Sequence, residues 1–449
     1  MARLFGTDGV RGEANKELTP ELAYRLGRAA TVFFGKDTDE QPVILIGMDT
    51  RISGPMFEAA LAAGICSAGG KAIIAGVIPT PAIAYLTKNT KAQAGIVISA
   101  SHNPYHDNGI KFFGGNGYKL PDAVEDQLEE LVREIENGDE LFRPIGEKIG
   151  TIEYRHDLVC KYIDYVVNTV DIDFEGMKVV LDCSNGASSE AMPIILNRLG
   201  AETIVLNADP NGININDKCG STHLECLKKA VKDHQADVGI ANDGDADRCL
   251  GVDEKGEVID GDKMLVMCAL NMMKQGTLKD NTVVSTVMAN IGFHKALKEA
   301  GAKVEVTKVG DRYVLENMLE NGYTLGGEQS GHIIFSEFST TGDGLITALQ
   351  LLSAIKKSGK KASELSGLMK SYPQLLVNVR VKTKDGWEEN KEIAEAIRSG
   401  NEELGENGRI LVRPSGTEPL IRVMAEGPEQ EQLHRICHFI ADVVKKVQG

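Results

Sequence analysis

An acidic loop is the most chemically suggestive stretch of the sequence. Asp243, Asp245 and Asp247 stand at every second position of a loop that ends in Arg248 and follows the apolar-containing segment 236–240. Carboxylates so close together repel one another unless a cation lies between them. Because carboxylate oxygens suit a hard cation, the spacing predicts a Mg²⁺ site after a buried strand.

Three other interpretations of the acidic loop stay open. A calcium loop of the EF-hand type would count Asp243 as its first position and Glu254 as its last, but it needs Gly where Arg248 stands. A phosphatase that forms an aspartyl phosphate would use one Asp as its nucleophile, and the residues after Asp245 suit that class poorly. A solvated acidic turn would need no ligand.

A pair of serines follows another apolar run. Gly95-Ile96-Val97-Ile98 predicts a buried strand, and Ser99-Ala100-Ser101-His102-Asn103-Pro104 predicts the loop at its C-terminal end. Ligands bind at this edge of an open α/β sheet, so a serine there is well placed for a reaction. The same local pattern also fits a capping or turn serine before Pro104.

A Gly-rich segment offers groups that suit a sugar. In Gly326-Gly327-Glu328-Gln329-Ser330-Gly331-His332, the side chains of Glu328 and Ser330 can hydrogen-bond hydroxyls or an amine. His332 can relay a proton. The alternative is a Gly-rich hairpin with a structural histidine.

Two basic positions suggest phosphate chemistry. Arg413 can hold a phosphate through two hydrogen bonds, and Ser415, Gly416 and Thr417 after it can form an anion-binding nest. A β-turn between two strands is the alternative for this loop. Lys111, just past the serine loop, is a further basic position, and a solvated surface lysine is its default interpretation.

Other catalytic motifs are excluded by their spacing. Gly69-Gly70-Lys71 lacks the spacing and the following Ser or Thr of a P-loop. No cluster of His and Cys suits zinc, and no G-x-S-x-G elbow surrounds Ser101.

The elements that must position these loops alternate along the chain. Apolar runs predict strands near 43–47, 71–75, 95–98, 177–182, 236–240 and 281–287, and helical patterns lie near 55–68, 82–86 and 123–136. Thr19 is a plausible N-cap of an earlier helix, with Pro20 at its first position. Strands that alternate with helices predict parallel or mixed sheets.

The C-terminal region has a different pattern. Segments 375–381, 408–413 and 420–425 predict strands, with helices at 390–403 and 430–447. We therefore predict three similar α/β domains with mixed sheets over 1–155, 156–256 and 257–370, and a smaller α+β domain over 371–449.

Composition limits the function classes. The 449 residues are 42% hydrophobic and carry a net charge of -16 with 5% aromatics, which argues against a nucleic-acid binder. The eight cysteines form no C-x-x-C pair, as in an intracellular protein. No apolar run approaches the roughly 20 residues that span a bilayer, and no leader follows Met1, so we expect a cytoplasmic protein without a membrane partner.

Taken together, the loops resemble a known family. The segments 99–104, 243–248, 327–332 and 413–417 occur in this order, and the set resembles the α-D-phosphohexomutase superfamily over essentially the whole chain. Phe5-Gly6-Thr7-Asp8-Gly9-Val10-Arg11-Gly12 resembles the branch that acts on an amino sugar phosphate. So does Gln329, since mannose and glucose mutases more often carry Met there.

The resemblance implies a role for each candidate residue. Ser101 would carry the transferred phosphate, which would complete a Mg²⁺ site with Asp243, Asp245 and Asp247. The sugar and its distal phosphate would be bound by Glu328, Ser330, Arg413, Ser415, Gly416 and Thr417. Arg11 and Arg248 would lie near the transferring group, and the base would be Lys111 or, as second choice, His332.

The resemblance also implies a reaction in a central cleft between the domains. Phospho-Ser101 would give its group to glucosamine 6-phosphate, and glucosamine 1,6-bisphosphate, the intermediate and activator, would turn round and return its other phosphate as glucosamine 1-phosphate forms. Glucose or mannose phosphates are the alternative substrates within the family. A phosphate-binding protein that kept the fold without turnover is the alternative from another class. A homodimer is one open possibility for the oligomeric state.

Overall fold

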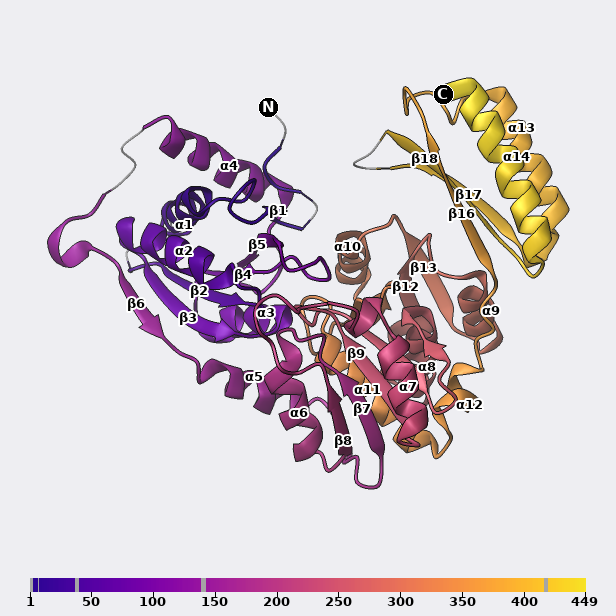
Figure 1. Cartoon of the computed structure of the whole chain (residues 1–449), viewed down its shortest axis with the longest axis horizontal. Helices are drawn as coiled ribbons and strands as arrows, with labels where there is room; N and C mark the ends of the chain where they lie inside the picture. Colours follow the sequence, from indigo (N-terminus) through magenta and orange to yellow (C-terminus); the bar gives the residue numbers. More distant parts are fainter. Residues whose placement is uncertain (1–2, 7, 37–39, 139–142, 416–418) are drawn as a thin grey trace. The chain divides into compact units, whose positions relative to one another are not determined.

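The fold is described from a computed structural model over residues 3–6, 8–36, 40–138, 143–415 and 419–449 (Figure 1). These residues form two compact units, a larger one of Met1–Val287 with Glu305–Ser366 and a smaller one of Met288–Val304 with Gly367–Gly449. Within the described ranges the strands form four sheets.

The first sheet is mixed and has the order β1-β5-β4-β2-β3-β6. β2 runs parallel to β3 and β4, while β5 runs antiparallel to β4 and β1. Its strands are β1 (Val10–Glu13), β2 (Val43–Met48), β3 (Lys71–Val77), β4 (Ala94–Ile98), β5 (Asp107–Gly114) and β6 (Thr151–Tyr154). The accompanying helices are α1 (Pro20–Phe34), α2 (Gly54–Ser67), α3 (Thr80–Asn89) and α4 (Asp122–Glu136).

Local sequence explains how this first layer forms. The Oγ1 atom of Thr19 accepts a 3.2 Å hydrogen bond from the N–H of Leu22, with Pro20 at the first helical position, so the predicted cap of α1 is confirmed. α1 packs against α2 and α4. Apolar side chains of the helices and of the β2 and β4 runs, such as Leu26, Phe57 and Ile96, share one buried core.

The second sheet has the order β11-β10-β9-β7-β8. β7 runs parallel to β8 and β9, and β10 runs antiparallel to β9 and β11. Its strands are β7 (Lys178–Asp182), β8 (Glu202–Leu206), β9 (Val238–Asn242), β10 (Cys249–Asp253) and β11 (Val258–Ile259). The helices are α5 (Leu158–Val167), α6 (Ser188–Arg198) and α7 (Glu225–Asp233).

The third sheet has the order β13-β12-β14-β15, with β14 parallel to β12 and antiparallel to β15. Its strands are β12 (Thr282–Thr286), β13 (Lys303–Thr307), β14 (Leu325–Gly327) and β15 (Ile333–Phe335). The helices of this part of the larger unit are α8 (Gly261–Gln275), α10 (Asp311–Asn321), α11 (Gly344–Ser358) and α12 (Ala362–Ser366). α8 and α11 pack against each other, and they contact β14 and β15 respectively.

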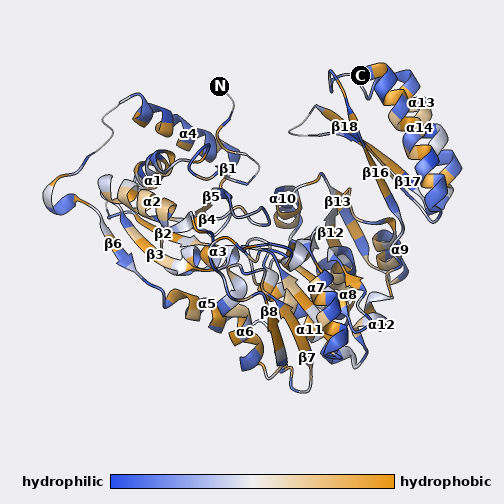
Figure 2. Cartoon of the chain, in the orientation of Figure 1, coloured by the Kyte–Doolittle hydropathy of each residue, from blue (hydrophilic) through white to orange (hydrophobic). Residues whose placement is uncertain are grey.

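The smaller unit holds an antiparallel sheet of order β16-β18-β17. Its elements are α9 (Ile291–Glu299), β16 (Gln374–Arg380), α13 (Lys391–Leu404), β17 (Arg409–Pro414), β18 (Leu420–Glu426) and α14 (Gln430–Gln448). α14 lies on β16 and β18 and packs against α13 over a common apolar core. In Figure 2, α13 and α14 carry hydrophobic and hydrophilic residues in alternating stripes, as expected for helices with one buried face.

The predicted fold class is confirmed: three mixed α/β sheets are followed by an antiparallel sheet with two helices. Several strands are absent from the sequence prediction. Among them is β5, whose Asp107-Asn108-Gly109 start has the composition of a turn. β5 is stabilised by pairing with β4 on one side and β1 on the other. Among the described residues, no helix is both long and apolar enough to cross a bilayer.

Candidate active site

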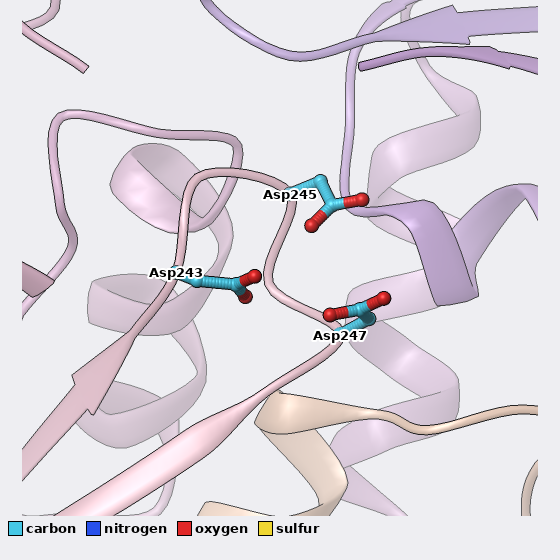
Figure 3. Close-up of side chains that lie close together, drawn as sticks. All are labelled: Asp243, Asp245 and Asp247. Carbon is cyan, nitrogen blue, oxygen red and sulfur yellow. The ribbon is translucent and has the colours of Figure 1, made fainter. Parts of the chain in front are cut away.

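The acidic loop connects β9 to β10, and its three aspartates are buried in the protein interior. One carboxylate oxygen from each of Asp243, Asp245 and Asp247 lies within 4.8 Å of the other two, and all three residues are buried (Figure 3). Burial and the carboxylates of Asp247 and Asp245 raise the pKa of Asp243 well above its ordinary value. Such a cluster is costly without a positive charge between its members.

The buried oxygens of this loop fit a metal ion. In the described part of the chain, Oδ1 of Asp245 and Oδ1 of Asp247 have no hydrogen-bond partner. Orphaned buried carboxylate oxygens are rare unless they serve a ligand. An all-oxygen donor set suits a hard divalent cation, so the triad fits metal binding.

Ser101 lies directly beside this triad. Its Oγ donates a 2.7 Å hydrogen bond to Oδ2 of Asp243, and the Ser101 side chain is buried. Gly244 permits the approach of the two loops, because a Cβ there would lie 2.6 Å from the carbonyl oxygen of Ser101. The serine and the acidic loop, 142 residues apart, therefore share one site.

The backbone of Ser101 is held in an uncommon conformation. Its φ of 52° lies in the left-handed region, which costs about 1–3 kcal/mol in a residue other than glycine. Ser99 stabilises this turn, since its Oγ accepts a 2.9 Å hydrogen bond from the N–H of Ser101 and donates one of 2.6 Å to Asp49. These contacts give Ser99 a structural role in the serine loop.

Arg51 is the main anchor of the serine loop and was not among the candidates from the sequence. Its guanidinium is completely buried, lies 2.9 Å from Oδ2 of Asp49, and donates to the carbonyls of Ser101 at 2.9 Å and Asn103 at 2.8 Å. It also donates to the carbonyls of Pro104 and Asp107. The available sequence signal was the polar Asp49-Thr50-Arg51 segment that follows β2, the neighbour of β4 in the sheet.

Two further polar residues join the loops. Asn216 donates to the carbonyl of Ser101 at 2.9 Å, and Thr80 donates through Oγ1 to Oδ2 of Asp245 at 2.7 Å. Neither had a sequence signal, because each meets its partner only through the tertiary fold.

Lys111 points from β5 into the same site. Its buried Nζ lies 2.7 Å from Oδ2 of Asp245 and 3.1 Å from Oδ2 of Asp8. Burial alone would lower the pKa of Lys111, but the carboxylates of Asp245 and Asp8 raise it above its ordinary value. Burial alone would likewise raise the pKa of Asp245, and the Lys111 ammonium lowers it. The solvated-lysine interpretation of Lys111 is therefore wrong.

His332 reaches the site from the Gly-rich segment between β14 and β15. Its Nε2 lies 3.6 Å from Oδ2 of Asp311 and 4.0 Å from Oδ2 of Asp247. The ring is buried, and neither of its nitrogens has a hydrogen-bond partner among the described residues. Both nitrogens can therefore form a hydrogen bond with a ligand beside the acidic loop.

The two sugar-binding candidates of the same segment lie nearer the surface. Glu328 is half-buried and its Oε1 accepts a 3.1 Å hydrogen bond from the N–H of Gly310, while Ser330 is exposed. Two arginines flank the site: Arg11 on β1 donates to the carboxylate of Asp8, and Nε of Arg248 lies 3.9 Å from Oδ1 of Asp247. In the larger unit, Ser101, Lys111, Arg248 and His332 therefore lie at the acidic loop. Arg11 is linked to the loop through Asp8 and Lys111.

The remaining candidates belong to the smaller unit. Arg413 lies on β17 opposite Arg422 of β18, and burial together with Arg422 lowers the pKa of Arg413. Ser415 is buried, and its N–H donates to the carbonyl of Leu420 at 2.8 Å. Gly416 and Thr417 lie outside the described residues. Two adjacent guanidinium groups beside a buried hydroxyl form an arrangement suited to an anion.

Comparison with known families matches this architecture from end to end. Residues 2–139, 160–256 and 260–372 match the phosphoglucomutase/phosphomannomutase alpha/beta/alpha domains I, II and III, and residues 376–443 match the C-terminal domain of the same family. The chain belongs to the phosphoglucomutase/phosphomannomutase family, whose members are phosphohexomutases.

Within this family the full-length relatives share one name. The phosphoglucosamine mutase of Heliobacterium modesticaldum is 54% identical, covering 99% of this chain and 100% of the relative. Those of Brevibacillus brevis and Geobacillus thermodenitrificans are each 53% identical, with at least 99% of both chains covered.

Solved structures share the fold at low identity. A phosphoglucomutase/phosphomannomutase family protein from Burkholderia thailandensis has a TM-score of 0.82 at 23% identity and covers 99% of this chain and 97% of its own. The N-acetylphosphoglucosamine mutase of Aspergillus fumigatus, solved with GlcNAc-6P and magnesium, has a TM-score of 0.68 at 18% identity, covering 99% and 96%.

Proposed function

We propose that this chain is a phosphoglucosamine mutase, an isomerase that interconverts glucosamine 6-phosphate and glucosamine 1-phosphate through a phosphorylated Ser101. The observation that carries the proposal is the contact of the Ser101 hydroxyl with Asp243 inside a buried acidic triad. The names of the relatives at 53–54% identity over full length support the choice of substrate.

The chemistry needs a phosphate held by the enzyme. The O1 and O6 atoms of a hexose are far apart, so the group moves in two transfers. In the first, the O1 oxygen of glucosamine 6-phosphate attacks the phosphorus of phospho-Ser101; the P–Oγ bond breaks and glucosamine 1,6-bisphosphate forms. After the bisphosphate turns round, Ser101 Oγ attacks its 6-phosphate, and glucosamine 1-phosphate is released.

Asp243, Asp245 and Asp247, with the phosphate of Ser101, would hold Mg²⁺. This ion would supply positive charge against the phosphoryl oxygens. Lys111 and Arg248 add further positive charge, since both already lie against carboxylates of the triad.

A proton must leave the attacking sugar hydroxyl. Lys111 was the first candidate for the base, but two carboxylates engage its ammonium and favour its charged form, as its raised pKa reflects. Both ring nitrogens of His332 lack a hydrogen-bond partner in the described part of the chain. We therefore propose that His332 accepts the proton of the sugar hydroxyl and that Lys111 neutralises negative charge.

The sugar and its distal phosphate complete the proposal. Glu328 and Ser330 are proposed to bind the sugar hydroxyls or the amine at C2. Arg413 and Ser415, with Gly416 and Thr417 of the same loop, are proposed to bind the phosphate that is not transferred.

The test is a comparison of kcat/KM for glucosamine 6-phosphate, glucose 6-phosphate and mannose 6-phosphate, with Mg²⁺ and the matching bisphosphate as primer. We expect kcat/KM for the amino sugar phosphate to exceed that for the other two by more than about 10-fold. A preference for glucose or mannose phosphate would assign the chain to the other activity of its family. Absence of turnover on all three would favour a binding protein.

A further inference from the structure

A closed series of charged side chains starts at the acidic loop and returns to it. Each aspartate of the series lies within 4.0 Å of a lysine or histidine of the series. We call this set the charge ring, and its members in order are Asp245, Lys111, Asp8, Lys119, Asp311, His332 and Asp247. All of them belong to the larger unit.

The first half of the charge ring leads away from the metal candidates. Lys111 links Asp245 to Asp8, at 2.7 and 3.1 Å respectively. The Oδ2 atom of Asp8 also accepts a hydrogen bond from Arg11. Asp8 therefore sets the position of two of the cations near Ser101.

The second half leads back through the sugar-binding segment. The Oδ2 atom of Asp311, at the start of α10, lies 3.6 Å from Nε2 of His332, whose ring lies 4.0 Å from Asp247. Of the two carboxylates that approach His332 among the described residues, Asp311 is the nearer, so a displacement of Asp311 would change the surroundings of the proposed base.

Lys119 is the only direct link between these two halves among the described ion pairs. Its Nζ lies 2.7 Å from Oδ1 of Asp8 and 2.6 Å from Oδ2 of Asp311. It stands in the segment between β5 and α4, whereas Asp311 is 192 residues further along the chain. Burial alone would lower the pKa of Lys119, but Asp311 and Asp8 raise it, so the side chain is a permanent cation.

We propose that Lys119 is a positioning residue for phosphoryl transfer. By holding Asp8 and Asp311 with one ammonium group, it fixes the Lys111 and Arg11 cations and the His332 ring in one arrangement. The inference rests on the proposed function. Without the ammonium, two carboxylates would face each other with no charge between them, and their repulsion would displace both halves of the ring.

The test replaces Lys119 by Met, which keeps the length of the side chain and removes its charge. A displacement of about 1 Å near reacting atoms costs about 100-fold, so kcat of K119M is expected to fall by about that factor. Because Lys119 contacts neither Glu328 nor Ser330, KM is expected to change by less than about threefold. K119R restores the charge and is expected to recover kcat to within about fivefold of wild type.

Lys16 offers a matched control. Its Nζ forms an ion pair of 2.6 Å with Glu13 on the surface, with 69% of the Lys16 side chain exposed. K16M also removes one ion pair of a lysine, and its kcat is expected to equal that of wild type. Circular dichroism and thermal unfolding of each variant establish that it is folded. K119Q replaces K119M if the latter is not, with the same loss expected.

The proposed activity and the positioning role of Lys119 can fail independently of each other. Wild-type turnover is measured first on glucosamine 6-phosphate; if it is absent, the proposed function fails, and the variants are compared on glucose 6-phosphate instead. The inference is overturned if folded K119M or K119Q keeps kcat within threefold of wild type. It is equally overturned if K119R fails to recover activity, or if K16M loses as much as K119M.

Discussion

The hydroxyl of Ser101 donates a 2.7 Å hydrogen bond to Oδ2 of Asp243. The serine that is proposed to be phosphorylated is thus already in contact with a candidate metal ligand. A phosphate on Oγ would bring further negative charge against a buried carboxylate, and only a cation can offset that repulsion. The phosphorylation of Ser101 and the binding of Mg²⁺ are therefore expected to support each other.

The first prediction follows from this coupling. Enzyme phosphorylated on Ser101 should bind Mg²⁺ at least about tenfold more tightly than unphosphorylated enzyme, because the phosphate adds charge and an oxygen ligand. Titration calorimetry of the two forms measures the difference. The variant Ser101→Ala supplies the reference, since it cannot carry the phosphate. Equal Mg²⁺ affinities of the two forms would show that the phosphate on Ser101 is not part of the metal site.

The second prediction concerns Asp245→Asn. The amide keeps the shape of the side chain but removes the charge that faces Lys111 and the proposed cation. Mg²⁺-dependent turnover should fall by more than about 100-fold, which corresponds to more than about 2.7 kcal/mol of transition-state stabilisation. Circular dichroism should show an intact fold. Unchanged activity across a Mg²⁺ titration would rule out Asp245 as a ligand.

A third prediction tests the anchor of the serine loop. Arg51→Met should lower the free energy of unfolding by about 3–5 kcal/mol, because it leaves the completely buried Asp49 carboxylate unpaired. Urea unfolding measures this loss. Arg398→Met, which removes exposed pairs with Glu395 and Glu402, is the matched control and should unfold like wild type. Similar stability of both variants would show that the Arg51 contacts do not hold the loop.

The fourth prediction is a pH dependence. Asp343 caps α11 and accepts a 2.8 Å hydrogen bond from the hydroxyl of Tyr162, and burial raises the pKa of Asp343 to about 6. Between about pH 4 and 6 the native state binds more protons than the unfolded chain. The contribution of this group to stability is therefore complete below about pH 4 and is lost as the pH rises through 6.

Asp343→Asn keeps the helix cap but cannot ionise. Its stability relative to wild type should rise by up to about 3 kcal/mol between pH 4 and pH 7. Thermal unfolding of the two proteins across this range gives the difference. A constant difference across the range would mean that Asp343 does not titrate there.

Two of the loop candidates were accessible from sequence because each follows an apolar strand. Ser101 and Asp243 stand directly behind buried runs, so local composition located both at the ligand-binding edge of a sheet. Their resemblance to a family then gave the roles that local patterns left open.

The residues that hold these loops could not be found in the same way. Arg51 is a charged side chain that the sequence assigns to the surface by default, and its complete burial depends on carbonyls of a loop about 50 residues away. Lys119 and Asp311 meet across 192 residues. Such pairings depend on how the sheets are assembled, which periodicity does not encode.

The proposed reaction requires that Ser101 pass its phosphate to glucosamine 6-phosphate. Enzyme phosphorylated on Ser101 is mixed with Mg²⁺ and a stoichiometric amount of this sugar phosphate, and intact-mass spectrometry follows the protein while chromatography follows the sugar. The protein should lose the mass of one phosphoryl group as glucosamine 1,6-bisphosphate appears in equal amount. A protein that keeps its phosphate, or releases it only as inorganic phosphate, would show that Ser101 does not transfer its phosphate to the sugar.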